Sequence, residues 1–156
     1  MQPTERRPDV DIEEEIEALT RSFAPLKASR GYFTAKSVDG HVKVVGNVRS
    51  PQARQVLLDN IPNIKGVVSC EGSELYDDEM IRFAVGQLLP PGVVAGVHYG
   101  AVALTGKLPE GVQPDTITKA ASGVKGVKRV VTDFNTSTDD EYRVPPYPID
   151  GDSLPK

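Results

Sequence analysis

Cysteine, histidine and clustered carboxylates are the residues of this sequence whose chemistry could support catalysis or metal binding. The single cysteine, Cys70, has no histidine placed as its base, and His41 and His98 have no cysteine or second histidine at ligand spacing. A zinc site needs three or four ligands, and a catalytic thiol needs activation. We therefore predict no metal site, no cofactor and no enzymatic activity. One cysteine also excludes an internal disulfide and is typical of a reducing compartment.

Carboxylates gather in two clusters, residues 13–15 and 77–79. Both lie at the start of apolar residues with helical spacing, where the helix dipole favours negative charge, so we assign them to helix capping and solvation. No Gly-x-x-x-x-Gly-Lys phosphate loop is present. The 22 acidic and 18 basic residues, a formal charge of -4, argue against binding to nucleic acid backbones. No apolar run approaches the length of about 20 residues that spans a bilayer.

An internal repeat positions most of these residues. Residues 40–48 and 100–108 share the pattern Gly-x-Val-x-(Val/Leu)-x-Gly-x-(Val/Leu), and residues 64–67 and 124–127 both read (Ile/Val)-Lys-Gly-Val. Both matches occur at one offset of 60 residues, which indicates duplication. Structural roles are assigned to the repeated glycines Gly40, Gly46, Gly66, Gly100, Gly106 and Gly126. At Gly46 and Gly106, on the core face of a strand, we expect a side chain to clash with the covering helix.

Each repeat predicts the order helix, strand, strand, helix, strand. The first helices are predicted over residues 11–23 and 77–89, ended by Pro25 and by Pro90, with a loop about five residues longer in the first repeat. Two-residue turns with glycine in second position then close a hairpin in each repeat. The second helices follow Ser50-Pro51 and Pro114, and the last strands are predicted at 67–68 and 127–131.

This order predicts an α+β fold of two α-β-β-α-β repeats, each a small three-stranded mixed sheet with two helices on one face. The expected divisions are an N-terminal tail (1–10), repeat 1 (11–74), repeat 2 (75–135) and a Pro-rich, acidic C-terminal tail (136–156). Such small units bury little surface, so we expect them to pack on each other or on a partner.

The duplicated hairpin glycines and the (Ile/Val)-Lys-Gly-Val motifs resemble a tandem of BON domains, a bacterial family, over roughly residues 11–135. The resemblance implies a module without enzymatic activity. It also implies an association with phospholipid binding, envelope maintenance, osmotic response or multimeric secretion assemblies. Most tandem members are exported or lipid-anchored, whereas this sequence has neither a signal peptide nor a lipobox cysteine. We therefore expect a cytoplasmic location, with a peripheral position at the inner face of the membrane as the alternative.

Two groups of residues are candidates for protein contacts. The outer sheet face of the second repeat is expected to carry Ala101, Ala103 and Thr105, which are small enough for close packing against a partner or against the other sheet. Pro145, Pro146, Tyr147 and Pro148 would suit a polyproline stretch that lies along an aromatic groove. The leading hypothesis is therefore an accessory or structural subunit of a larger bacterial protein complex.

A basic cluster supports the first alternative, a peripheral protein that binds anionic phospholipid. Lys125, Lys128 and Arg129 surround the end of the last predicted helix, and each basic residue at an anionic surface contributes about 1 kcal/mol. An apolar face with Met80, Ile81, Phe83, Leu88 and Leu89 is a further candidate for lipid contact, although such residues are more often core. The second alternative, osmotic-stress or small-ion sensing in the cytoplasm, has no residue signature.

Overall fold

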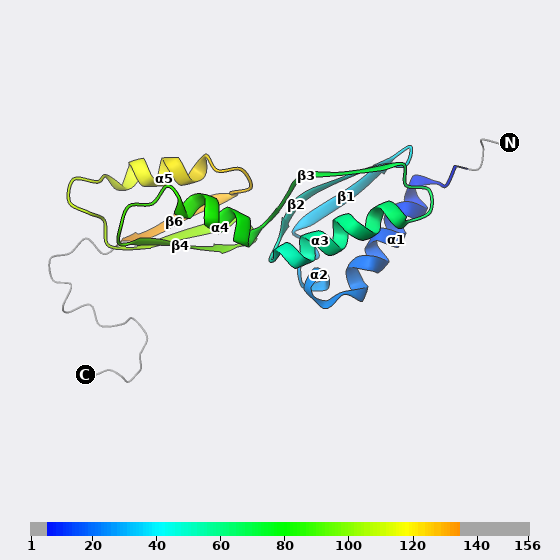
Figure 1. Ribbon diagram of the computed structural model, residues 1–156, viewed down its shortest axis with the longest axis horizontal. Helices are drawn as coiled ribbons and strands as arrows, with labels where there is room; N and C mark the ends of the chain where they lie inside the picture. The colour runs from blue at the N-terminus through cyan, green and yellow to red at the C-terminus, as the bar shows by residue number, and fades with distance from the viewer. Residues whose placement is uncertain (1–5, 135–156) are drawn as a thin grey trace, which may run out of the picture.

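A computed structural model describes residues 6–134, which form two units lying end to end (Figure 1). The first unit comprises α1 (Asp9–Ser22), α2 (Ala24–Ala28), β1 (Phe33–Val38), β2 (His41–Val48), α3 (Pro51–Asn60), a 3-10 turn (Ile61–Asn63) and β3 (Ser69–Asp77). The second unit comprises α4 (Asp78–Gly86), β4 (Val93–His98), β5 (Ala101–Gly106), α5 (Pro114–Ser122) and β6 (Arg129–Phe134). Strand β3 runs directly into α4, so the units are joined without a linker.

Each unit contains one three-stranded sheet, in the orders β1-β2-β3 and β4-β5-β6. In both sheets the first two strands pair antiparallel and the last strand pairs parallel to the central one. The helices cover one face of each sheet, below it for the first unit and above it for the second in the view of Figure 1. The predicted α+β fold with two mixed sheets is therefore confirmed.

Each unit has its own hydrophobic core between sheet and helices. In the first unit α1 buries Ile12 and Ile16 against strand residues that include Val44. In the second unit Ile81 and Val85 of α4 do the same. Of the apolar positions expected on the core face of the second strands, Val42, Val44, Val48, Val102 and Leu104 are buried, whereas Leu108 lies beyond the end of β5 and is half-buried. Within the apolar face expected on this helix, Ile81 is buried whereas Met80, Phe83 and Leu88 are exposed, because the buried face of α4 is centred on Ile81 and Val85.

The same hydrogen-bonding device closes both hairpins. Both turn residues have positive φ, 54° and 83° at Asp39 and Gly40 and 50° and 84° at Tyr99 and Gly100, as a type I′ turn requires. The Asp9 carboxylate accepts hydrogen bonds from both amides of the first turn, at 2.8 and 2.9 Å. The carboxylate of Asp78 does the same in the second turn, at 2.7 and 3.1 Å. The acidic residue at the helix start therefore fastens the helix to its hairpin.

The sequence separation between these equivalent aspartates shows where the two repeats differ in length. Asp9 and Asp78 are 69 residues apart, whereas Gly40 and Gly100 are 60 apart, so the first unit has nine additional residues between helix and hairpin rather than about five. Pro25 does not end the first helix as predicted, because α1 ends at Ser22. It lies instead in the first turn of α2, where its missing amide hydrogen costs no helical bond. The additional segment therefore contains α2.

The element ends also depart from the predicted ones. Helix α1 begins at Asp9, inside the expected tail, and α4 ends at Gly86 rather than near residue 89. The last strands start later than predicted, because Val68 and Lys128 donate backbone hydrogen bonds to the turn glycines Gly40 and Gly100 before the strands begin. Both strands also run beyond their predicted ends, to Asp77 and to Phe134.

Gly106 is required by a close approach of the backbone. Its φ is +112°, and a Cβ added there would lie 2.0 Å from the carbonyl oxygen of Gly92. The obstacle at Gly46, with φ +133°, is likewise the backbone of Tyr32 and Phe33. The expected clash with the covering helix is therefore wrong, because in both units the obstacle is the backbone at the start of the paired first strand.

We predict that Gly106→Ala lowers the free energy of unfolding by at least about 2 kcal/mol, because it adds positive-φ strain to the backbone clash. Gly96→Ala is the matched control, since a Cβ at Gly96 meets nothing within 4 Å and its φ is not positive. The control should stay within about 1 kcal/mol of the parent. Urea unfolding of both variants measures the difference, and equal stabilities would contradict the argument.

A second prediction concerns acid stability. Hydrogen bonds from the Ser37 side chain and from the Gly40 and Asp39 amides, together with the nearby Arg6 charge, lower the pKa of Asp9. A depressed folded-state pKa stabilises the fold above the unfolded pKa, and that contribution disappears as pH falls through the folded value. In urea unfolding from about pH 6 to pH 2.5, Asp9→Asn should be less stable than the parent at the upper end, and the gap should close at the lower end. A gap independent of pH would count against this role.

Candidate functional site

The two units meet at the hairpin turn of the second unit, where the Tyr99 side chain packs against the first unit. Its ring stacks on Tyr32, with ring centroids 3.7 Å apart and planes 4° from parallel. Its hydroxyl donates to the Ala28 carbonyl at 3.1 Å and lies 3.2 Å from Ser29 Oγ. Ala28 and Ser29 both belong to the segment that only the first unit contains, at the end of α2. The additional residues of the first unit therefore form the socket for Tyr99.

An ion pair links the units beside this ring. Arg49, which follows β2, donates through Nη1 to Asp78 Oδ2 at 2.7 Å and to the Val97 carbonyl at 2.9 Å. The Asp78 side chain is only 6% exposed, and its carboxylate also accepts the two turn amides. Arg49 lies 5.7 Å from the centre of the Tyr99 ring. The buried carboxylate thus accepts three hydrogen bonds, two from its own unit and one from the first unit. Because a buried charge is costly without its partners, this ion pair fixes the orientation of the second unit relative to the first.

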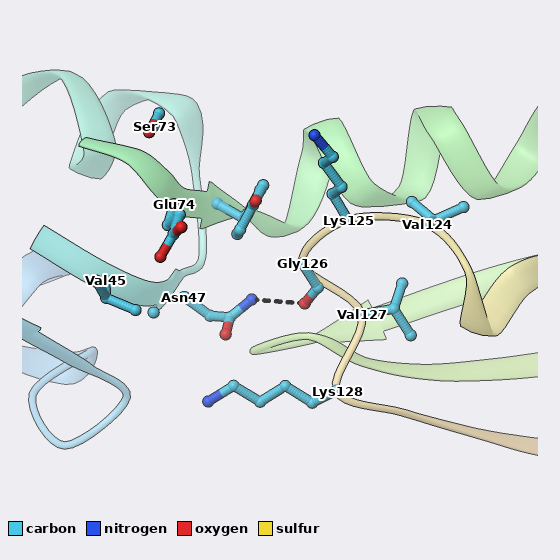
Figure 2. A pocket seen from close by; sticks show the side chains of 11 residues that line it. Val45, Asn47, Ser73, Glu74, Val124, Lys125, Gly126, Val127 and Lys128 are labelled. Carbon is cyan, nitrogen blue, oxygen red and sulfur yellow. Dashed lines mark hydrogen bonds between the residues drawn. The ribbon is translucent and has the colours of Figure 1, made fainter. Parts of the chain in front are cut away.

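The third contact uses the amide of Asn47, which is 1% exposed. Its Nδ2 donates to the Gly126 carbonyl at 3.1 Å, as the dashed line in Figure 2 shows. A Cβ at Gly100 would lie 2.7 Å from the same Asn47 nitrogen, and one at Gly126 would lie 2.6 Å from Tyr76. Glycine at these two positions therefore allows the units to approach closely.

A groove of about 610 Å³ opens beside this contact, between the units. It is lined from the first unit by Val45, Gly46, Asn47, Ser73, Glu74 and Tyr76, and from the second by Val124, Lys125, Gly126, Val127 and Lys128. In Figure 2 Lys125 and Lys128 lie on opposite sides of the Asn47–Gly126 hydrogen bond. Glu74 faces the groove from the first unit and pairs with Lys43 at 3.7 Å. The groove therefore carries charges of both signs.

The residues predicted for binding occupy two separate places. Lys125 and Lys128 are exposed at the groove, whereas Arg129 begins β6 next to Ala101 of β5. Ala101 and Ala103 are half-buried and Thr105 is exposed on the face of β5 opposite the helices. The two sheets do not meet there, because the units touch end to end (Figure 1). Pro145, Pro146, Tyr147 and Pro148 lie outside the described residues.

The candidate catalytic residues remain scattered. His41 Nδ1 lies 2.7 Å from Ser69 Oγ, and His98 stands edge-on to Tyr99. Burial and the neighbouring Glu71 carboxylate raise the pKa of the Cys70 thiol, which keeps it protonated near neutral pH. Within residues 6–134 no group of three or more histidine, cysteine or acidic side chains is placed to hold a metal ion. None of the described helices is long and apolar enough to cross a membrane.

Sequence reasoning missed the residues that join the units. Tyr99, Arg49 and Asn47 stand where the other repeat has Asp39, Pro109 and Lys107. The sequence signal for these residues was their difference from the aligned residues of the other repeat. The clearest case is Tyr99, an aromatic residue at a turn position with positive φ. A residue that departs from its repeat at a strained position indicates a contact that only one repeat makes.

Comparisons with known proteins agree with the fold. Residues 77–137, which include nearly all of the second unit, match the BON domain, in agreement with the resemblance that the glycine pattern predicts. The first unit shares its sheet topology. No curated protein matches the sequence.

Two solved structures resemble both units together. One is the C-terminal domain of CdsD, described as the structural protein of the type III secretion system of Chlamydia trachomatis, with a TM-score of 0.69 and 14% identity over 84% of this chain and 68% of that one. The other, also CdsD of that organism, has a TM-score of 0.64 and 14% identity over 87% and 69%. At such identity the likeness establishes the fold alone.

We predict that Tyr99→Asn loosens the joint while both units stay folded. Asparagine tolerates positive φ, so the variant removes the ring and its hydroxyl without straining the turn. Backbone ¹⁵N relaxation should then report separate tumbling of the two units, and the maximum dimension from X-ray scattering should increase. Asp39→Asn makes the same replacement at the equivalent turn of the first unit and should change neither quantity. Unchanged relaxation in Tyr99→Asn would show that the ring does not hold the joint.

Proposed function

We propose that this protein is a binding module without enzymatic activity that acts as a structural or accessory subunit of a larger bacterial protein assembly, and that its second unit carries the docking surface. The observation that carries the proposal is a difference between the repeats. The two units share one sheet topology, yet their outer surfaces differ in polarity at equivalent positions.

The outer sheet faces display this difference. In the second unit the face opposite the helices includes Val94, 62% exposed, and Val131, 49% exposed, on either side of Ala103 and Thr105. The equivalent positions of the first unit carry Thr34, Glu71, Lys43 and Val45. A charged face is stable in water, whereas neighbouring exposed valines and small residues favour burial against another protein. Ala101, Ala103 and Thr105 thus belong to the proposed docking surface.

The helix layer follows the same pattern. Phe83 of α4 is 71% exposed, and Met80 and Leu88 are about half exposed beside it. The residues of α1 equivalent to Met80 and Phe83 are the exposed acids Asp11 and Glu14. An unpaired aromatic side chain is a common anchor in protein interfaces. The second unit therefore exposes a phenylalanine on its helix layer and valines on its sheet layer. The exposed apolar residues of the first unit are the valines Val10, Val38, Val45 and Val68, and Tyr32, which stacks on Tyr99.

The joint supports a structural role. The Tyr99 stack, the Arg49–Asp78 ion pair and the Asn47–Gly126 hydrogen bond all oppose rotation of one unit against the other. A fixed angle between two units lets one hold the other at a set position in an assembly. The BON domain match and the fold shared with a secretion-system structural protein agree with a binding module.

Anionic phospholipid is the competing ligand. Lys125, Lys128 and Arg129 are exposed, but Lys125 and Lys128 lie at the groove between the units, apart from Arg129 at the start of β6. A role in osmotic stress and a location in the cytoplasm stay predictions from the sequence.

The test is purification of the tagged chain from its native host in mild detergent, with mass spectrometry of the proteins and lipids that accompany it. We expect a stoichiometric protein partner that is reduced at least about tenfold by Val94→Lys or by Phe83→Lys, because a lysine at a desolvated contact loses its hydration. Thr34→Lys and Glu14→Lys place the same residue at the equivalent positions of the first unit, and they should retain the partner.

Two outcomes would contradict the proposal. One is a partner retained in full by both second-unit variants, which would move the docking surface elsewhere. The other is enrichment of anionic lipid with no stoichiometric protein, together with its loss when Lys125, Lys128 and Arg129 are changed to glutamate, which would favour the membrane function.

A further inference from the structure

Strand β4 is an edge strand of the second sheet, and the hairpin determines which of its amide and carbonyl groups face β5 and which face the edge. The turn Tyr99-Gly100 has two residues, so the flanking pair His98 and Ala101 exchange hydrogen bonds. The pairs Gly96–Ala103 and Val94–Thr105 exchange hydrogen bonds in the same way. The peptide groups of Val93, Ala95 and Val97 therefore point away from β5, toward the open edge of the sheet.

Only some of these edge groups have partners. The Val93 amide donates to the Pro90 carbonyl at 3.2 Å, and the Val97 carbonyl accepts from Arg49 at 2.9 Å. Among residues 6–134 no hydrogen bond satisfies the amide of Val97, the amide and carbonyl of Ala95, or the carbonyl of Val93. They alternate as donor and acceptor groups along an extended backbone, which is the pattern another strand completes.

In the first unit one of the equivalent edge groups is bonded by a side chain of the covering helix. Strand β1 carries Phe33, Ala35 and Ser37 at the equivalent positions, and the Ser37 amide donates to Glu13 Oε2 at 2.8 Å. Glu13 lies four residues after Asp9 on α1, and the residue four after Asp78 on α4 is Arg82. A guanidinium has no acceptor atom, and Arg82 pairs with Glu79 instead at 2.6 Å. The carboxylate that accepts the Ser37 amide in the first unit is therefore replaced by a cation in the second, which leaves the equivalent Val97 amide without that acceptor.

We propose that the edge of β4 accepts an extended segment of a partner protein as a fourth strand. This inference rests on the proposed function and names the form in which the partner binds. Arg82 and Glu79 form an exposed surface pair of little net stability, so the guanidinium can instead bind an acidic side chain on the helix side of the added strand. The exposed Val94 selects for an apolar side chain on the outer side. A second copy that paired through its own β4 would bring another Arg82 to the edge, so charge favours a different chain.

The edge already takes part in an interface, because Arg49 of the first unit binds the Val97 carbonyl. Strand addition would extend that interface along β4 toward Val93. The orientation of Val97 is thus held before binding, which reduces the entropy lost when a peptide docks.

Proline at position 95 tests the proposal with little risk to the fold. The Ala95 amide does not bond β5, so Ala95→Pro removes an edge donor and obstructs an incoming strand while the sheet keeps its hydrogen bonds. Ala35→Pro is the matched control, since Ala35 holds the same edge position in β1. Circular dichroism and urea unfolding establish that both variants fold.

The probe is a phage-displayed library of random peptides of about ten residues, the upper length of a typical strand, panned on the full chain. Selected peptides should alternate apolar and polar residues and include an acid. Their affinity should fall at least about tenfold in Ala95→Pro and stay unchanged in Ala35→Pro. In the complex the Ala95 and Val97 amides should gain protection from hydrogen exchange.

Three results would overturn the inference. They are the absence of selected peptides, selected peptides that bind Ala95→Pro as tightly as the parent, and self-association of the parent chain that Ala95→Pro abolishes, which would make a second copy the occupant. If the native partner is lost in Val94→Lys or Phe83→Lys but retained in full by Ala95→Pro, the proposed function stands and strand addition fails.

Discussion

The carboxylate of Asp78 is the group on which the arrangement of this molecule depends. It is buried, and it accepts the two amides of a strained turn within its own unit and the guanidinium of Arg49 from the other. A buried carboxylate is stable only when such donors surround it, so the turn, the helix start and the neighbouring unit must take their positions together. The local fold of the second unit and its attachment to the first are therefore one hydrogen-bonded system.

The equivalent carboxylate, Asp9, shows what duplication preserved and what it changed. It fastens the first hairpin in the same way, but its turn carries Asp39 in place of Tyr99, and Asp39 pairs with Arg6 at the surface. The first unit supplies the socket, which is made from α2, and the second unit supplies the tyrosine ring that fills it. One fold thus supplies two roles because side chains diverged at positions that the backbone leaves free.

The fold could be predicted largely from sequence because local rules determine it. Glycines at turn positions, valines at alternate strand positions and a proline after Ser50 each constrain the backbone by sterics or a capping hydrogen bond, and all recur at one spacing. The errors arose where tertiary contacts prevail. Pro25 was compatible with ending one helix or beginning another, and the Gly46 obstacle came from a backbone segment that no periodicity places.

The duplication, the element order and the mixed sheets follow from the amino-acid sequence, because they arise from interactions between residues close in the chain or repeated within it. The joint of Tyr99, Arg49 and Asn47, and the β4 edge groups that have no hydrogen-bond partner among residues 6–134, emerge only in the folded molecule. Tyr99 and Ala28 are 71 residues apart, and their hydrogen bond depends on how two separately folded units come together. No pattern within one unit encodes that placement, since it is set by shape and by the pairing of buried polar groups across the joint.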